Sequence, residues 1–388
     1  MTEKLFYEDS YIKEFQARVL SCRERNGGYQ AVLTRTAFFP EGGGQSADTG
    51  FLYTKEGEEI RVTDVHEKDG VVYHHISQPV QEGTEVRGKL DFQERFSKMQ
   101  QHTGEHIISG LVHARFGYDN VGFHLGNDYC TMDFNGPITP EELEEIEWEA
   151  NRAVALNLKV ETLYPSREEL SFMEYRSKIE IEGQVRIIEI PGFDVCACCA
   201  PHVKRTGEIG LIKLVGRMNY KGGERITMLC GFRALRDYRI KQANVKAIGN
   251  LLCEKENETA KAVEKLKAER DGWKNRTLLL QKKLLRYQAA ETAIREGVTW
   301  IFDSGLEGNG PRELMNALLD RGAKIAAVFA GTSEEGYRYV IGSRKEDVRP
   351  FGKELNERFA GRGGGKPEMV QGSLKGKQCL IEEYLKNK

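Results

Sequence analysis

The sequence predicts a multidomain α+β protein built from four successive parts. Residues 1–90 alternate apolar and polar residues between turn signals, which favours a small antiparallel sheet or β-barrel. Residues 236–295 carry a long charged helical pattern, and the chain then alternates strand and helix signals to its end. With 388 residues and 39% hydrophobic content, the chain can bury several cores. We expect domains at 1–90, 91–235, 236–295 and 296–388.

The composition is that of an ordinary soluble protein. No stretch approaches the roughly eighteen consecutive apolar residues of a membrane span, and the start, MTEKLFYEDSYIKEF, is too acidic and polar for a signal peptide. Of the eight cysteines, three cluster at positions 196, 198 and 199 and the rest are scattered. This usage suits metal binding in a reducing compartment. We therefore expect a cytoplasmic protein without disulfides or a membrane partner.

The two halves of the chain differ in charge although the net charge is only −2. Residues 236–388 contain 30 Lys+Arg and 22 Asp+Glu, a balance of +8, which leaves −10 for the first 235 residues. A basic half suggests a polyanionic partner. A long charged helix has charged faces in any case, so both interpretations stay open.

The first domain contains an unusual glycine run in FFPEGGGQSADTG, where Gly42, Gly43 and Gly44 follow a predicted strand. Three glycines allow the backbone to come close to a ligand or to another domain. A flexible hairpin loop is the alternative.

A helix is expected from Asp91, with Glu94 completing a capping box, to Gly117. It contains HTGEH, in which His102 and His106 stand four residues apart and therefore share one face of the helix, one turn apart. Such a pair can supply two ligands to a zinc ion. The apolar side of this helix is made of Phe92, Phe96, Met99, Ile107 and Leu111.

The remainder of the second domain leads to a cysteine-rich turn. VGFHLGNDYCTMDF reads as a strand pair about Gly-Asn-Asp, and Thr139-Pro140 with Glu142 opens a helix. VRIIEI then precedes CACCAPH, in which Cys198 and His202 are again four residues apart. Together with the histidine pair they make a tetrahedral set of four zinc ligands. Cys196 and Cys199 are more simply explained by packing near the metal.

The helical pattern of 236–295 has a faulty heptad seam, interrupted by Lys255, Arg270 and two threonines. Either one rod or a hairpin breaking near Asp271-Gly272 fits the pattern. In both cases the segment spaces domains or pairs two chains.

The C-terminal domain places the strand candidates TWIFD, KIAAVFA and YRYVIG between helices such as PRELMNALLDRG and LKGKQCLIEEYLK. Its glycine-rich motif, GRGGGKPEMVQGS, is not a P-loop, because Pro367 follows Lys366 where Ser or Thr is required. Two interpretations of this turn remain open: a backbone nest that binds phosphate, or a tight joint between domains.

These motifs resemble the editing half of alanyl-tRNA synthetase and its free-standing relatives, the AlaX trans-editing proteins. The resemblance rests on TAFFPEGGGQ, RFSKMQQHTGEH and CCAPHV followed by TGEIG, with GGGKPEMVQG resembling the C-terminal domain of the synthetases. It covers nearly the whole chain in the order of the long AlaX form. It implies a zinc-dependent deacylase for tRNA of alanine mischarged with serine or glycine.

The resemblance also implies roles for individual residues. The metal ligands fall on His102, His106, Cys198 and His202, although this chain reads CCAPH where the family usually reads CGGTH. Substrate contacts are implied for a further set of residues, Thr36, Gly43, Gly44, Gln45 and His124, with Thr36 sensing the serine hydroxyl. No general base is assigned.

The same motifs bear on three other functions. We expect no ATP-dependent aminoacylation domain ahead of the editing half, and no phosphoesterase, since no Asp-His-His triplet occurs. The remaining alternative is a zinc-stabilised tRNA-binding protein without hydrolytic activity. A homodimer through the C-terminal half is expected in either case.

Overall fold

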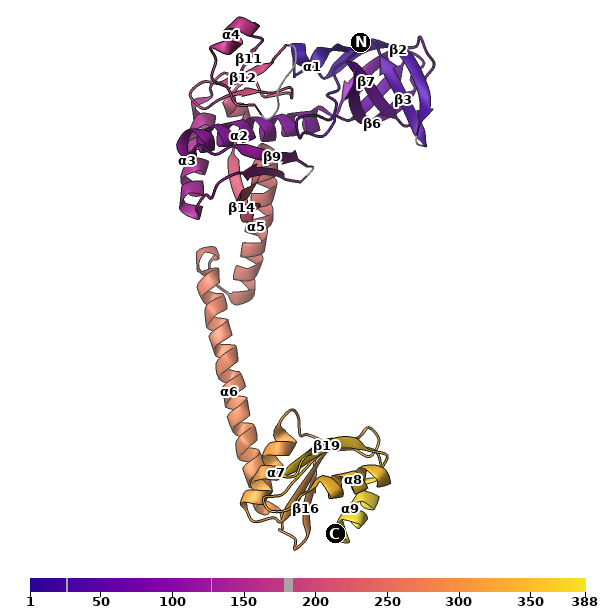
Figure 1. Ribbon diagram of the computed structural model, residues 1–388, viewed down its shortest axis with the longest axis vertical. Coiled ribbons are helices and arrows are strands. Elements are labelled where there is room, and N and C mark those ends of the chain that lie inside the picture. Colours follow the sequence, from indigo (N-terminus) through magenta and orange to yellow (C-terminus); the bar gives the residue numbers. More distant parts are fainter. Residues whose placement is uncertain (26, 127, 178–183) are drawn as a thin grey trace. The chain divides into compact units, whose positions relative to one another are not determined.

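The structure is a computed structural model that describes residues 1–25, 27–126, 128–177 and 184–388 (Figure 1). It divides into two compact units, Met1–Val245 and Lys246–Lys388, and each is described by itself. Within the described residues, no helix is long and apolar enough to cross a membrane. The multidomain mixed α/β class predicted from the sequence is confirmed, as is the N-terminal barrel.

The barrel closes in the strand order β2-β3-β7-β6-β5-β8. Its strands alternate buried and exposed residues, so that Val86, Gly88 and Leu90 of the last strand face the interior, as expected for a closed sheet. The six strands are β2 (Glu14–Arg25), β3 (Gly28–Leu33), β5 (Gly50–Thr54), β6 (Glu59–Lys68), β7 (Val71–Ile76) and β8 (Glu85–Leu90). Beside them lie β1 (Glu3–Lys4), α1 (Leu5–Glu8) and β4 (Arg35–Thr36), with β1 parallel to β4.

Helix α2 (Phe92–Phe116) follows directly from the barrel and ends at Gly117 in the left-handed conformation, as predicted. The predicted capping box at its start is wrong. The Asp91 side chain makes no cap hydrogen bond and instead accepts hydrogen bonds from Thr49 Oγ1 (2.6 Å) and Arg61 Nη2 (2.8 Å) of the barrel. Thr49 and Arg61 compete with the helix N-terminus for the Asp91 carboxylate, because α2 begins directly beside the barrel.

A buried ion pair joins the barrel to α2. Arg95 is 1% exposed and donates to Asp48 through Nε (2.8 Å) and Nη2, and also to the Ala37 carbonyl. Lys98, one turn later, donates to the Ala47 carbonyl. These two cations hold the chain that follows the glycine run against α2, which matters for the site described below.

The rest of the first unit wraps a four-stranded sheet, in the order β14-β15-β10-β9, and a three-stranded sheet, β11-β12-β13, around α2. The predicted strand pair β9–β10 is present, but its turn includes Asn127, which lies outside the described residues. Thr139 and Glu142 form the predicted capping box. The elements are β9 (Asn120–Leu125), β10 (Cys130–Phe134), α3 (Pro140–Leu156), β11 (Glu161–Leu163), α4 (Arg167–Ser171), β12 (Ile187–Ile190), β13 (Asp194–Ala197), η1 (Thr206–Ile209), β14 (Ile212–Tyr220) and β15 (Gly223–Cys230).

The long helical segment is broken, but not where the sequence suggested. Helix α5 (Gly231–Leu252) ends at Cys253, whose φ of 54° is left-handed, and α6 (Thr259–Glu291) follows the short helix η2 (Glu256–Glu258). Both the single rod and the break near Asp271-Gly272 are therefore wrong. Gly272 lies inside α6 with open space where a Cβ would stand, so it costs helix propensity and nothing more.

The second unit is a five-stranded sheet in the order β16-β17-β18-β20-β19, with β16 and β17 parallel and the other pairs antiparallel. The glycine-rich motif forms a hairpin: the exposed edge strand β19, a turn at Pro367-Glu368 and most of β20. A Cβ at Gly363 or Gly365 would collide with the backbone of β20, which explains two of the glycines. The elements are β16 (Val298–Phe302), α7 (Gly310–Asp320), β17 (Ile325–Thr332), β18 (Gly336–Gly342), α8 (Arg349–Arg358), β19 (Arg362–Lys366), β20 (Met369–Leu374) and α9 (Gln378–Lys386).

Candidate metal centre and adjoining cavity

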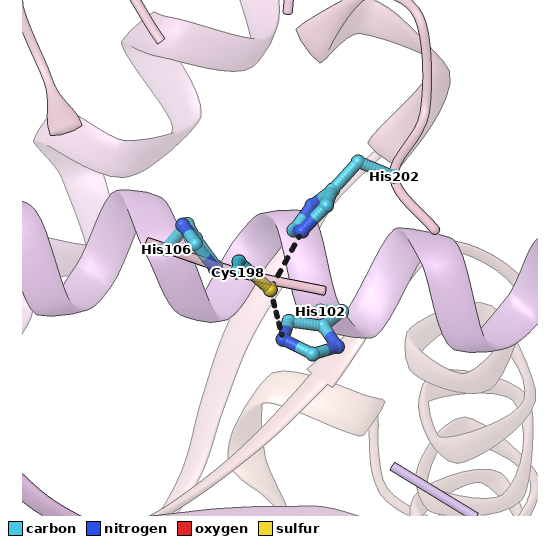
Figure 2. Close-up of side chains that lie close together, drawn as sticks. All are labelled: His102, His106, Cys198 and His202. Carbon is cyan, nitrogen blue, oxygen red and sulfur yellow. Dashed lines mark hydrogen bonds between the residues drawn. The ribbon is translucent and has the colours of Figure 1, made fainter. Parts of the chain in front are cut away.

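Four side chains from two distant segments meet beside α2. His102 and His106 point from consecutive turns of the helix, with their ring centroids 5.4 Å apart. Cys198 and His202 come from the turn after β13, and Figure 2 shows their side chains directed toward the helix. The sulfur of Cys198 lies 3.5 Å from His102 Nε2 and 3.4 Å from His202 Nε2. One ligand atom from each of the four residues lies within 4.8 Å of the others.

Each of the three histidines is oriented by a neighbour at its other ring nitrogen. The Nδ1 atom of His102 lies 2.9 Å from Gln45 Oε1, that of His106 lies 2.9 Å from Asp194 Oδ2, and that of His202 lies 3.0 Å from Thr103 Oγ1. When Nδ1 carries the proton and donates it, Nε2 presents its lone pair to the group. Metal-binding histidines are held by such outer partners.

Two features of the chain bring Asp194 to His106. Gly110, one turn after His106, has no room for a side chain, since a Cβ there would fall on the carbonyl oxygen of Phe193 and lie 2.9 Å from Asp194 Cβ. Arg176 then holds the carboxylate through Nε (2.7 Å) and Nη2 (2.9 Å). The close approach of this loop to α2 therefore depends on a glycine.

The electrostatics of the group favour a thiolate. Burial raises the pKa of the Cys198 thiol, but His102 and His202 lower it by more, so that the net pKa lies well below its usual range. Burial lowers the pKa of His106, but the hydrogen bond to Asp194 and the neighbouring Cys196 and Cys198 together raise that pKa well above its usual value. A thiolate next to imidazoles is a donor set that zinc prefers.

The other two cysteines of the cluster occupy different places. Cys196 is 5% exposed and lies with His106 and Asp194 in a second group of possible ligands. Cys199 is exposed as a residue, but its sulfur lies against the glycine run, and this partial burial raises its pKa to about 11. Among the described residues, Cys198 is the cysteine that meets all three histidines.

A cavity of about 620 Å³ opens beside the group and is lined by His102, His106 and Cys198. The glycine run forms part of its wall through Gly43 and Gly44, whose φ angles of 59° and 80° are left-handed. A Cβ at Gly44 would lie 2.6 Å from the carbonyl oxygen of Phe123 in β9. The run is therefore docked on β9 of the same unit and is not a free hairpin loop.

The other residues singled out by the resemblance lie in different places. Gln45 is buried and stands behind His102, and its Nε2 has no partner among the described residues. Thr36 is fully buried in the barrel, 2.8 Å from His74 Nε2, and His124 is exposed on β9. The structure brings neither Thr36 nor His124 to the lining of the cavity.

Sequence reasoning missed Thr103, Gly110, Arg176 and Asp194. Thr103 lies within HTGEH, so a search for polar residues next to the ligands would have found it. Asp194 and Arg176 carry no local signal, because their role depends on a loop that packs on α2.

Two family models match separate parts of this chain. Residues 185–227, which hold the cysteine turn, match the family model for the threonyl and alanyl tRNA synthetase second additional domain. Residues 4–94, which hold the barrel, match the model for class II (A) tRNA synthetases.

Individual relatives extend the match over the whole chain. The alanyl-tRNA editing protein AlaX-L of Pyrococcus horikoshii is 29% identical over 97% of this chain and 96% of its own length. The alanyl-tRNA editing protein Aarsd1 of Rattus norvegicus is 28% identical over 98% of both chains. The alanine–tRNA ligase of Pyrococcus abyssi is 32% identical, but the chain spans only 42% of that ligase. The resemblance seen in the motifs is confirmed: over nearly its whole length, this chain is similar to alanyl-tRNA editing proteins, AlaX-L among them.

Proposed function

We propose that this chain edits mischarged tRNA of alanine: water cleaves the aminoacyl ester, releasing serine or glycine and the free terminal hydroxyl of the tRNA. The observation that carries the proposal is the convergence of the two half-sites, His102 with His106 and Cys198 with His202, at the inner wall of a cavity. The names of the two full-length relatives support the same activity.

Zinc is the metal that best fits the donor set. Three imidazoles whose Nδ1 atoms are already engaged, together with a thiol of lowered pKa, are typical of zinc ligands. Bound there, zinc would supply a Lewis acid that can polarise the ester carbonyl or a water molecule. The chain itself would hold the ion through His102, His106, Cys198 and His202 and would orient these ligands through their outer partners.

The alternative function is a zinc-stabilised tRNA-binding protein that hydrolyses nothing, for which four protein ligands and a closed metal site would suffice. The cavity argues against it, because His102, His106 and Cys198 line an open space of about 620 Å³. A purely structural metal site has no need of such a space.

The decisive experiment supplies tRNA of alanine charged with serine, glycine or alanine and measures release of each amino acid, with zinc per chain from elemental analysis. The wild-type protein should release serine and contain one zinc. His102→Ala combined with His106→Ala should lose both. His113→Ala, an exposed histidine on the same helix, is the matched control. A wild-type protein that holds zinc but releases no amino acid would establish the alternative.

The proposed partners are tRNA and a second copy of the chain. The second half carries the positive balance, and exposed Arg362 and Lys366 flank the glycines of β19, which supports contacts with phosphates. Helix α6 exposes Leu280, Leu284 and Tyr287 along one seam, at 58%, 66% and 70% exposure, which supports pairing with the same helix of another copy.

A further inference from the structure

The cavity has a buried end and an open end. His102 and His106, at the metal group, are each 2% exposed, whereas Tyr164 in the same lining is 50% exposed. Tyr7 and Arg186, which also line the cavity, are half-buried. The wall therefore leads outward from the metal group to two tyrosines and an arginine.

A chain of contacts ties this open end to the metal-binding turn. Arg186 Nη1 donates to the carbonyl oxygens of Cys198 (2.7 Å) and Ala200 (3.0 Å). Its guanidinium lies 5.8 Å from the centre of the Tyr7 ring, and the hydroxyl of Tyr164 donates to the Tyr7 carbonyl (3.4 Å). The Tyr7 ring is thus a neighbour of the turn that carries Cys198, and Tyr164, in the same cavity lining, is joined to Tyr7 through its hydroxyl.

The charge at this end is also suited to a nucleotide. Of the described residues that line the cavity, Arg186 is the only lysine or arginine. Its Nε atom is buried and has no partner within the described part of the chain. A guanidinium can contact a phosphate, and aromatic rings stack on bases regardless of their identity.

The proposed function dictates what must lie next to the metal group. In an aminoacyl-tRNA the ester is attached to the ribose of the last nucleotide, so the base and phosphate of that nucleotide follow within one sugar of the reacting carbonyl. Building on the proposed function, we infer that Tyr164 and Tyr7 form the subsite for this terminal base and that Arg186 faces the phosphate of the same nucleotide.

The test of the base subsite compares two small substrates, seryl-adenosine and serine methyl ester, which differ in the presence of the nucleoside. The measured quantity is the ratio of their kcat/KM values. Tyr164→Leu should lower this ratio about tenfold, the loss expected for one stacked base, and Tyr164→Phe should restore it because the ring returns. Tyr238→Leu is the control, since Tyr238 is 60% exposed on α5 and lies outside the cavity lining.

The role of Arg186 is tested with two substrates that both carry the serine ester on the ribose, adenosine 5′-phosphate esterified with serine and seryl-adenosine. The measured quantity is the ratio of kcat/KM for the first substrate over that for the second. Arg186→Gln should lower this ratio about two- to fivefold, and Arg186→Lys should retain more of it. Zinc per chain is measured for both variants, because Arg186 also holds the metal-binding turn. A phosphate preference that survives in a zinc-loaded Arg186→Gln variant would overturn this part of the inference.

The outcomes separate the subsite from the function. If the wild-type protein cleaves neither mischarged tRNA nor seryl-adenosine, the proposed function fails and the subsite fails with it. If the wild-type protein cleaves both and Tyr164→Leu keeps the full preference for seryl-adenosine, the subsite alone is overturned.

Discussion

Helices α2 and α6 invert the usual relation between polarity and burial. Helix α2 is 25 residues long and buries fifteen of them, including Arg95, Lys98, His102, Glu105 and His106. Helix α6 is 33 residues long and buries only Leu285 and Ala289, while leucines along its length are exposed. The polar side chains of α2 are buried because each has a partner from another segment. The exposed leucines of α6 have no such partner among the described residues of this copy.

In these two helices, burial follows the presence of partners from other segments and not the hydrophobicity of the side chains. Burying a polar group without a partner costs about 1–3 kcal/mol, so a helix such as α2 is stable only when its neighbours are in place. A helix such as α6 gains most of its stability from whatever covers its apolar seam.

The largest effect on the metal group should come from filling the space at Gly110. Gly110→Ala should displace the loop that carries Asp194, because the new methyl group would fall on the Phe193 carbonyl. We expect zinc affinity to fall about 10- to 100-fold, the range for loss of an outer partner of a metal ligand. Competition with a chromogenic chelator measures it.

Gly272→Ala is the matched control, since the same substitution in α6 meets open space. It should leave zinc affinity unchanged and stabilise α6 by up to about 1 kcal/mol. Equal zinc affinity in Gly110→Ala and Gly272→Ala would contradict the prediction, because it would show that displacing the Asp194 loop from α2 does not affect zinc binding.

The proposed pairing of two copies through the apolar seam of α6 can be tested by placing lysines on that seam. Leu280→Lys with Leu284→Lys should raise the dissociation constant of the proposed dimer about 100-fold or more, because two apolar side chains lose their cover. Analytical ultracentrifugation measures the shift. Leu279→Lys, 63% exposed but off the seam, should dissociate no dimer. A wild-type protein that sediments as a monomer at all concentrations would refute the pairing.

Buried polarity in the barrel should make the first unit sensitive to acid. Burial lowers the pKa of His74 from 6.5 to about 4. Between these pH values, the unfolded chain therefore binds a proton at this histidine that the folded chain does not bind. Stability should therefore fall as the pH drops from about 6.5 toward 4, by about 2 kcal/mol at pH 5. Hydrogen exchange of β3 and β7 amides at pH 7 and pH 5 measures it, after correction for intrinsic rates. His74→Leu should flatten this dependence.

The smallest effect concerns the basic second unit. Arg362→Gln with Lys366→Gln should weaken tRNA binding, and the slope of log affinity against log salt should become shallower by roughly one to two. Filter binding over a series of salt concentrations measures both. Lys377→Gln, which removes an exposed lysine at the N-cap of α9, provides a comparison for general loss of charge.

The sequence predicted the metal group well because its signal is local. Two four-residue spacings in HTGEH and CCAPH identified His102, His106, Cys198 and His202, and these side chains do meet. Local signals also predicted the cap at Thr139 and the end of α2 at Gly117.

The remainder depended on contacts between distant segments. Asp194 reaches His106 only because Gly110 allows its loop to approach α2. Asp91 does not cap α2, because its carboxylate accepts hydrogen bonds from Thr49 and Arg61 instead. The helix breaks at Cys253, and neither the single rod nor the break near Asp271-Gly272 anticipated this. The nearby Gly249 allows the turn, because a Cβ there would lie 2.9 Å from the carbonyl oxygen of Glu254, a contact between segments that the local sequence does not show.

The distance along the chain between the two half-sites has a consequence of its own. His106 and Cys198 are separated by about ninety residues, so an ion held by both would close a long loop in the manner of a cross-link. In the chain-entropy model a loop of this size restricts the unfolded ensemble by about 4–5 kcal/mol. An ion bound there would act as a removable staple, and the folding of the first unit would then respond to the free zinc concentration of its surroundings.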